Sequence, residues 1–146
     1  HRSARGFVPR NILLPADFTP ASEGAAHYAG TLAREYNAKL TVLHVLDYAE
    51  LSGVADRAEV MQGVERKLSA LIGKEAEGLQ LCCRVETGKV VPTILQTQAE
   101  IDADLLVMGV RPWSGLLDRL MWPHAYEIVR EAACPVLTVR GKVSQH

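Results

Sequence analysis

The residues best suited to chemistry lie in one stretch, Asp104 to Ala125, which reads DLLVMGVRPWSGLLDRLMWPHA. Its first part predicts a buried strand through Met108, followed by Gly109, where the backbone can turn without a Cβ clash. A polar loop with Ser114 and Gly115 near its tip comes next, and helical spacing then resumes. In open α/β sheets, a strand, a loop and a helix in this order form ligand sites, because backbone N–H groups there can bind phosphate. The stretch therefore predicts a ligand-binding loop.

The acids and hydroxyls do not predict a catalytic centre. Asp102 and Asp104 flank the start of the same strand, at the end of the sheet away from the loop, and are expected to be solvated turn residues. Asp118 is expected to face solvent on a helical turn. Ser114 lies in Trp-Ser-Gly, which lacks the Gly-x-Ser-x-Gly pattern of a nucleophile elbow. We therefore expect no catalytic residue and no enzymatic activity.

The histidines and cysteines show no spacing typical of metal ligands. His44 lies in the middle of a predicted strand and is expected to be a hydrogen-bonded core histidine, whereas His124 can face the ligand pocket. Cys82 and Cys83 are adjacent, so in a strand they would point to opposite faces and could not readily pair. Cys134 is expected to serve packing. These patterns predict no metal site, and three unpaired cysteines fit a reducing cytoplasm best.

Strand and helix patterns alternate along the chain in the order β-α-β-α-β-α-β-loop-α-β. This order requires a parallel sheet with right-handed crossovers and helices on both faces. The predicted strands lie at Arg10–Leu14, Lys39–Asp47, Leu79–Val85, Leu105–Met108 and Pro135–Arg140, and helices are predicted to start at Pro20, near Val54, at Pro92 and near Pro123.

The first helix has the clearest boundary signals. Thr19 is the expected N-cap before Pro20, and Asn37 is expected to close the helix in a left-handed conformation. Pro15, which has no N–H to donate, is expected to stop pairing of the preceding strand. The apolar stripe predicted for the buried face of the helix comprises Ala25, Tyr28, Ala29, Leu32 and Tyr36.

The totals describe an ordinary globular domain. The chain has 146 residues, 48% hydrophobic and 23% charged, with a net charge of −1. We expect one domain over residues 7–141, with residues 1–6 and 142–146 as flexible ends or cloning remnants. Scattered basic residues and the lack of an apolar run of about 20 residues argue against nucleic-acid and membrane partners. A further interpretation is a domain cut from a larger transporter or kinase.

Several stretches, in order, resemble the universal stress protein family. They are Ile12–Thr19, Leu43–Val45, Gly88 with Pro92, Ala103–Gly109, Trp113–Leu116 and Ala133–Arg140. The resemblance implies an α/β, Rossmann-like, three-layer fold of the adenine nucleotide alpha hydrolase type. Its open sheet has five parallel strands in the order 3-2-1-4-5, with a switch point between strands 1 and 4. It also implies a homodimer paired through the last strand, Val136–Arg140.

Nucleotide-binding members of the family carry G-x2-G-x9-G-[ST] after the fourth strand. In this chain the four motif positions are Gly109, Pro112, Trp122 and Pro123. The two prolines supply no N–H, and the indole is bulky where the family has no side chain. The resemblance therefore points to the branch with a degenerate ATP-binding loop.

This chain matches the family better at the positions that bind adenosine than at the positions of the phosphate motif. By resemblance, Asp17 would accept a hydrogen bond from ribose or adenine, and Ser114, Gly115 and His124 would complete a nucleotide or small-ligand pocket. An equally simple interpretation makes Val45 and Met108 core residues and lets Asp17 satisfy donors in its own turn. The residues that match the base and ribose pocket are Pro15, Ala16, Asp17, Val45, Met108 and Gly109.

The resemblance implies a cytoplasmic regulatory or interaction domain of the stress response. We expect it to be dimeric, to contact protein partners and to lack tight ATP binding, so no cofactor is assigned. The alternative is an ATP- or AMP-binding member with weak hydrolysis or autophosphorylation, in which Ser114 and Gly115 donate to phosphate from a rearranged loop.

Overall fold

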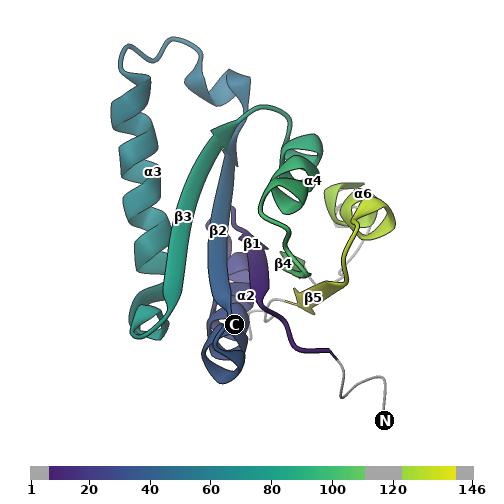
Figure 1. Cartoon of the computed structure of the whole chain (residues 1–146). Helices are drawn as coiled ribbons and strands as arrows, with labels where there is room; N and C mark the ends of the chain where they lie inside the picture. The colour runs from purple at the N-terminus through teal and green to yellow at the C-terminus, as the bar shows by residue number, and fades with distance from the viewer. Residues whose placement is uncertain (1–6, 111–122, 141–146) are drawn as a thin grey trace, which may run out of the picture.

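The fold is a five-stranded parallel sheet with the strand order β3-β2-β1-β4-β5 (Figure 1). The computed structural model describes residues 7–110 and 123–140. The order predicted from the family resemblance is therefore confirmed. The strands are β1 Asn11–Pro15, β2 Lys39–Leu46, β3 Gln80–Thr87, β4 Leu105–Val110 and β5 Val136–Arg140.

Helices cover both faces of the sheet, with α2 and α3 on one side and α4 and α6 on the other (Figure 1). The helix predicted to start near Val54 begins later, because Asp56 accepts from the Glu59 N–H as its N-cap. No helix in the two described ranges is long and apolar enough to cross a membrane. The helices are α2 Pro20–Tyr36, α3 Arg57–Ile72, α4 Val90–Glu100 and α6 Pro123–Glu131, with short 3-10 turns at Tyr48–Leu51 and Gly73–Ala76.

Two hydrophobic cores lie on opposite faces of the sheet. Along β1, Ile12 and Leu14 belong to the larger core under α2 and α3, whereas Leu13 belongs to the smaller core under α4 and α6. All three side chains are fully buried. Successive residues of a strand point to opposite faces, so a strand covered on both faces needs an unbroken apolar run. This explains why the central strands are the most apolar stretches of the sequence.

Helix α2 packs on the sheet mainly through small residues, and the predicted stripe was wrong at its two tyrosines, whereas Leu32 packs partly buried against the larger core. Tyr28 and Tyr36 are 47% and 42% exposed. The backbones of α2 and β4 come closest at the start of the helix, where a Cβ on Gly109 would be 2.2 Å from the backbone oxygen of Ala21. The buried residues of α2 are Ala21, Ser22, Ala25, Ala26, Ala29, Gly30 and Ala33.

The predicted ends of α2 are confirmed. The Thr19 hydroxyl accepts from the Ser22 N–H at 3.3 Å, and Asn37 ends the helix with φ 55° and ψ 44°. A side chain that satisfies an otherwise orphan N–H fixes where the helix starts. The position of the turn before α2 therefore follows from local chemistry.

Pro15 ends the pairing of β1 on one side only, which corrects the prediction that it stops pairing altogether. Pairing with β2 runs through Pro15, and the Ala16 N–H donates to the Leu43 oxygen at 2.8 Å. Pairing with β4 is limited to Ile12 and Leu13. Alternate residues of a strand direct their N–H groups to opposite neighbours, so the missing N–H of Pro15 is the one that would face β4. The carboxyl ends of β1 and β4 consequently part.

Asp104 ties the starts of two strands together and is not the solvated turn residue that was predicted. Its carboxylate accepts from the Arg10 N–H at 3.0 Å and from the Asn11 N–H at 3.1 Å. The Asn11 side chain donates to the Ile101 oxygen at 3.0 Å. Asp102 is exposed with φ 54°, as expected of a turn residue. The Asp104 carboxylate therefore joins the starts of β1 and β4 at the end of the sheet away from the pocket.

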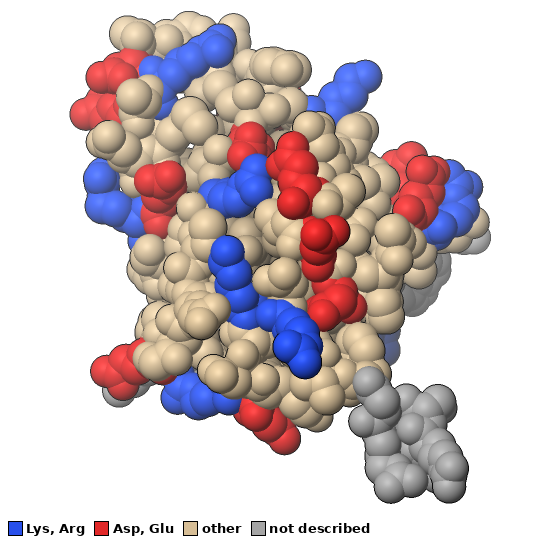
Figure 2. Space-filling model, in the orientation of Figure 1, with Lys and Arg blue, Asp and Glu red and all other residues tan. Residues whose placement is uncertain are grey.

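The outer strand β3 carries charge that is paired locally. Arg84 contacts Glu86 at 2.9 Å and Glu100 at 3.0 Å. Figure 2 shows acidic and basic side chains interspersed on the face of the molecule that it draws, with neither sign covering a continuous area.

Cys82, Cys83 and Cys134 are free thiols, each partly buried, as the spacing predicted.

Candidate functional site

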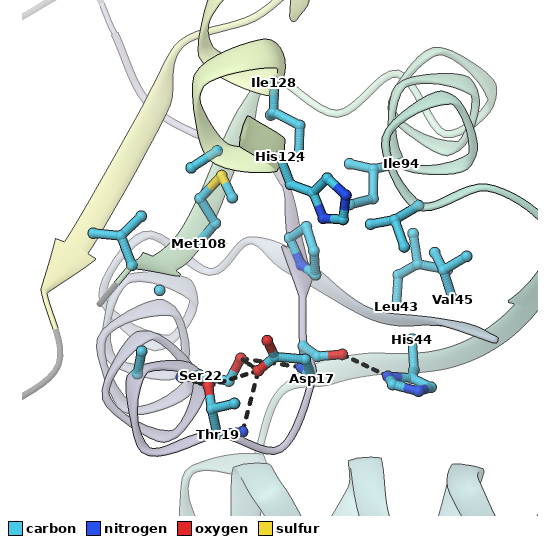
Figure 3. A pocket seen from close by; sticks show the side chains of 17 residues that line it. Asp17, Thr19, Ser22, Leu43, His44, Val45, Ile94, Met108, His124 and Ile128 are labelled. Atoms are coloured by element: carbon cyan, nitrogen blue, oxygen red, sulfur yellow. Dashed lines mark hydrogen bonds between the residues drawn. The ribbon is translucent and has the colours of Figure 1, made fainter. Parts of the chain in front are cut away.

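A pocket of about 270 Å³ opens where β1 and β4 part, at the carboxyl ends of the strands (Figure 3). Its walls come from β1, β2, β4, the turn between β1 and α2, and the N-terminal parts of α2, α4 and α6. Ligand sites of open α/β sheets lie at this switch point. The pocket brings together seven of the nine predicted residues, whose role in binding remains a prediction: Pro15, Ala16, Asp17, Val45, Met108, Gly109 and His124. The other two, Ser114 and Gly115, lie outside the described residues.

The Asp17 carboxylate organises the turn from β1 into α2. Its Oδ1 accepts from the Thr19 N–H at 3.1 Å, the Thr19 hydroxyl at 2.6 Å and the Ser22 hydroxyl at 2.7 Å. Burial acts to raise the pKa of Asp17, but these hydrogen bonds outweigh it, and the positive potential of His44 adds to them, so the pKa is lowered from its ordinary value. The predicted local role of Asp17 is confirmed for one oxygen. The described hydrogen bonds leave Oδ2 to accept from a ligand.

His44 supports the same turn from β2. Its Nδ1 lies 2.7 Å from the Ala16 oxygen, and because a carbonyl can only accept, Nδ1 must carry the proton. The predicted hydrogen bond is confirmed, although the residue is half-buried at the pocket wall and not in the core. Phe18 packs on the imidazole with ring centroids 4.9 Å apart, and the Lys67 ammonium lies 5.7 Å from the Phe18 ring centre. These contacts fix the position of the His44 ring at the pocket wall.

Phe18 has a backbone conformation that bulky residues rarely adopt. Its φ is 66°, in the left-handed region, which costs an L residue about 1–2 kcal/mol. Contacts with His44 and Lys67 and with the larger core offset that cost. Sequence reasoning missed Phe18 because nothing in its residue type signals a left-handed turn.

Apolar side chains make up most of the pocket wall. Val45 and Met108 are each 8% exposed and belong to the smaller core, which confirms the simpler interpretation of them. Both also line the pocket, and their part in binding a ligand stays a prediction. Val90 and Ile94 of α4 also line the pocket and were missed, since their helical spacing is that of any packed helix. Walls of this kind suit a small organic ligand with an apolar body.

His124 lies on the first turn of α6, and its side chain is exposed. Figure 3 shows its ring directed into the pocket beside Ile94, on a different side from Asp17. The prediction that His124 can face the pocket is therefore confirmed. The described residues contain no cluster of three or more side chains that could hold a metal.

Gly109 lies within β4, so the predicted turn at this residue is wrong. A Cβ there would also meet the Ala21 carbonyl carbon at 2.4 Å and the Ser22 nitrogen at 2.9 Å. The close approach of α2 alone therefore requires glycine, whether or not a phosphate binds nearby.

The comparisons with known proteins agree with this architecture. A model of the universal stress protein family matches residues 9–140. A universal stress protein of Thermus aquaticus, named for its place in the QAH/OAS sulfhydrylase 3′ region, is 30% identical over 142 residues, covering 90% of this chain and 98% of the relative. A universal stress protein solved in complex with cAMP has a TM-score of 0.73 at 21% identity, covering 93% and 100% of the two chains. One from Archaeoglobus fulgidus in complex with dAMP has a TM-score of 0.66 at 17% identity, covering 91% and 99%.

Proposed function

Because this chain belongs to the universal stress protein family, we propose that it is a regulatory domain of the stress response. In this proposal it acts in the cytoplasm as a homodimer, contacts other proteins, has no enzymatic activity and binds no nucleoside triphosphate tightly. The observation that carries the last point is the contrast between a formed pocket at the switch point and a phosphate motif occupied by Pro112, Trp122 and Pro123.

A triphosphate needs several backbone N–H donors around its oxygens. Two of the four motif positions are proline, which has no N–H, and a third is tryptophan. The remaining position, Gly109, is explained by its contact with Ala21 and so is not evidence for a phosphate site. The sequence and the packing together support loss of the triphosphate cradle.

A second candidate is an AMP- or ATP-binding protein with weak hydrolysis or autophosphorylation. The observation that favours it is that seven residues predicted for the ligand share one pocket. Similar folds were solved with cAMP and dAMP, each of which carries a single phosphate. These ligands support binding of a mononucleotide more than binding of ATP.

Calorimetric titration with ATP, ADP and AMP, each with and without Mg²⁺, tests the proposal. We expect ATP to bind no more tightly than AMP and Mg²⁺ to make no difference. Micromolar ATP binding that requires Mg²⁺ would overturn the proposal.

The second candidate is tested by phosphate release from labelled ATP and by transfer of label to the protein. If the pocket acts on ATP, Asp17→Ala should abolish both signals and the retention of nucleotide by the purified protein. Identical results for Asp17→Ala and the unchanged chain would reject this candidate. Asp17→Asn is the matched control, since an amide keeps an acceptor oxygen in the turn.

The edge strand β5 is the proposed dimer contact. Leu106 N–H donates to the Pro135 oxygen, so Pro135 faces β4, and alternate residues Val136, Thr138 and Arg140 direct their N–H groups outward. An edge strand with free outward N–H groups can pair with a second copy. Proline is tolerated where the N–H faces solvent, so Thr138→Pro should block pairing and leave the contact with β4 intact.

Light scattering after size exclusion measures the outcome. We expect a dimer for the unchanged chain and for Thr138→Val, and a monomer for Thr138→Pro. A dimer mass that persists in Thr138→Pro would reject β5 as the contact. Charges at Leu137 or Val139 would be a poorer test, because both side chains pack against the larger core.

A further inference from the structure

The outer strand β3 has one edge without a neighbouring strand in the described part of the chain. β3 lies at the end of the sheet and pairs with β2 alone (Figure 1). The Gly88 N–H donates to the Leu46 oxygen of β2 at 3.0 Å. Every second residue of a parallel strand faces the same neighbour, so the even-numbered residues of β3 face β2. The residues between them direct their N–H groups outward, where no described residue accepts from them: Leu81, Cys83, Val85 and Thr87.

This edge lacks the features that keep exposed strands from pairing. Natural edge strands are short, or they carry proline, a bulge or an unpaired lysine. β3 has eight residues, contains no proline or glycine, and pairs with β2 without a bulge along its whole length. Its charged residues, Arg84 and Glu86, bond each other at 2.9 Å. The outward N–H groups are therefore open to a further strand.

The side chains beside this edge carry net negative charge on the α4 face of the sheet. Arg84 contacts Glu86 at 2.9 Å and Glu100 at 3.0 Å, so one guanidinium neutralises only one of two carboxylates. Both hydrogen bonds from Arg84 to Glu86 end on Oε2, from Nε at 3.3 Å and from Nη2 at 2.9 Å. The described hydrogen bonds leave Oε1 of Glu86, a side chain that is 40% exposed, to a cation from outside.

The α3 face of the same edge is apolar, with a further carboxylate near it. Leu81 and Cys83 pack partly buried against the larger core, and the Cys83 Sγ lies 3.6 Å from the Ser69 hydroxyl oxygen of α3. Glu65 is one turn before Ser69 and lies on the same side of the helix. Burial raises the pKa of the Cys83 thiol, and the negative charge of Glu65 adds to the rise. Both faces of this edge therefore favour a basic partner.

We propose that β3 binds an extended, basic segment of a partner protein, which joins the sheet as a new strand beside β3. In such complexes main-chain hydrogen bonds supply affinity and alternating side chains supply specificity. The segment places apolar side chains on the α3 face and lysine or arginine near Glu86 on the α4 face. Two β3 strands side by side would bring like net charges together, which disfavours a second copy. This inference rests on the protein contact of the proposed function and names its surface and the chemistry of the partner.

The probe is a fluorescent peptide with blocked ends, Val-Lys-Val-Lys-Val-Lys-Val, titrated with the full chain and followed by anisotropy. We expect binding below about 1 mM, and binding at least about tenfold weaker for the same peptide with glutamate in place of lysine. Cys83→Pro should weaken binding about tenfold, because it removes a central outward N–H and leaves pairing with β2 intact. Cys83→Val keeps that N–H and should bind as the unchanged chain does. Far-UV circular dichroism checks that both variants are folded.

The charge contribution has its own pair of variants, which do not depend on the folding of Cys83→Pro. Glu86→Gln should weaken binding of the lysine peptide about threefold. Glu131→Gln is the matched control, because Glu131 also pairs with an arginine, at 3.0 Å, but lies on α6, far from β3 (Figure 1). It should leave the affinity unchanged.

Hydrogen exchange measured by NMR locates the bound peptide. In the peptide-free chain the outward amides of Cys83 and Val85 should exchange faster than the inward amides of Arg84 and Glu86, and the peptide should slow the outward pair alone. Equal binding by Cys83→Pro and Cys83→Val, or no binding up to about 1 mM, would overturn the inference.

A second copy on β3 would also overturn it. In that case the outward amides would already be slow without peptide, and Cys83→Pro would lower the mass measured by light scattering. Each of these outcomes leaves the other parts of the proposed function in place, since Thr138→Pro tests the contact through β5 and the nucleotide titration tests the pocket.

Discussion

Gly109→Ala isolates the close approach between β4 and α2. The added Cβ would lie 2.2 Å from the Ala21 oxygen and 2.4 Å from its carbonyl carbon, about 1 Å short of ordinary contact. The obstructing atoms belong to the backbone, so no side-chain rotation can relieve the clash, and the start of α2 must move. Overpacking costs about 1–3 kcal/mol, and we expect about 3 kcal/mol here, since a helix has to shift. For a chain of this length that corresponds to a fall in Tm of about 10 °C.

Urea unfolding followed by far-UV circular dichroism measures this loss in the absence of any ligand. Gly24→Ala in the same helix is the matched control, because a Cβ there meets nothing within 4 Å. Replacing a glycine inside a helix should raise the free energy of unfolding by about 0.5–1 kcal/mol. A Gly109→Ala protein within about 0.5 kcal/mol of the unchanged chain would refute the packing explanation for this glycine.

Three further changes test the turn and the strand starts. Asp104→Asn should lower the free energy of unfolding by about 1 kcal/mol, because the N–H groups of Arg10 and Asn11 lose a charged acceptor; chemical denaturation measures this. The lowered pKa of Asp17 stabilises the fold above its ordinary value of 3.8, and this contribution is lost as the pH falls through the lower folded value. The stability difference between the unchanged chain and Asp17→Asn should therefore be constant from about pH 7 to 5 and shrink below about pH 4, as urea titrations across pH would show. Phe18→Gly should be about 1 kcal/mol more stable than Phe18→Ala in the same assay, because only glycine adopts φ 66° without strain, and equal stabilities would contradict that strain.

The sequence predicted the sheet well because its central strands are covered on both faces. Ile12, Leu13 and Leu14 form an unbroken apolar run, which a strand with one wet face would not need. The ends of α2 were predictable for a different reason, since Thr19 and Asn37 act through local hydrogen bonding and local backbone conformation. The strand order came from the family resemblance.

The buried face of α2 was not predictable from its own residues. Alanine and tyrosine both count as apolar in a helical pattern, so the pattern does not show which of them faces the sheet. At the start of the helix, the close approach to the sheet depends on Gly109, far along the chain. In the same way, Asp102 and Asp104 look alike in sequence, and the fold alone brings Asp104 to the backbone of β1.

The family resemblance predicted pocket residues that lie at strand ends and missed those whose place in the pocket depends on packing. Pro15, Asp17 and Met108 lie at the carboxyl ends of adjacent strands, which must meet at one edge of a parallel sheet. Val90 and Ile94 reach the pocket only because α4 crosses that edge. Their helical spacing alone does not distinguish a pocket wall from an ordinary core.

Pro15 affects the rate at which a ligand can enter the pocket between β1 and β4. Because Pro15 has no N–H, the ladder bond that it would donate to β4 is missing whether or not a ligand is bound. A ligand entering there needs no prior opening of the sheet, and encounter can proceed without a slow isomerisation step. Differences in affinity among ligands should then appear in their dissociation rates, with similar rate constants for association.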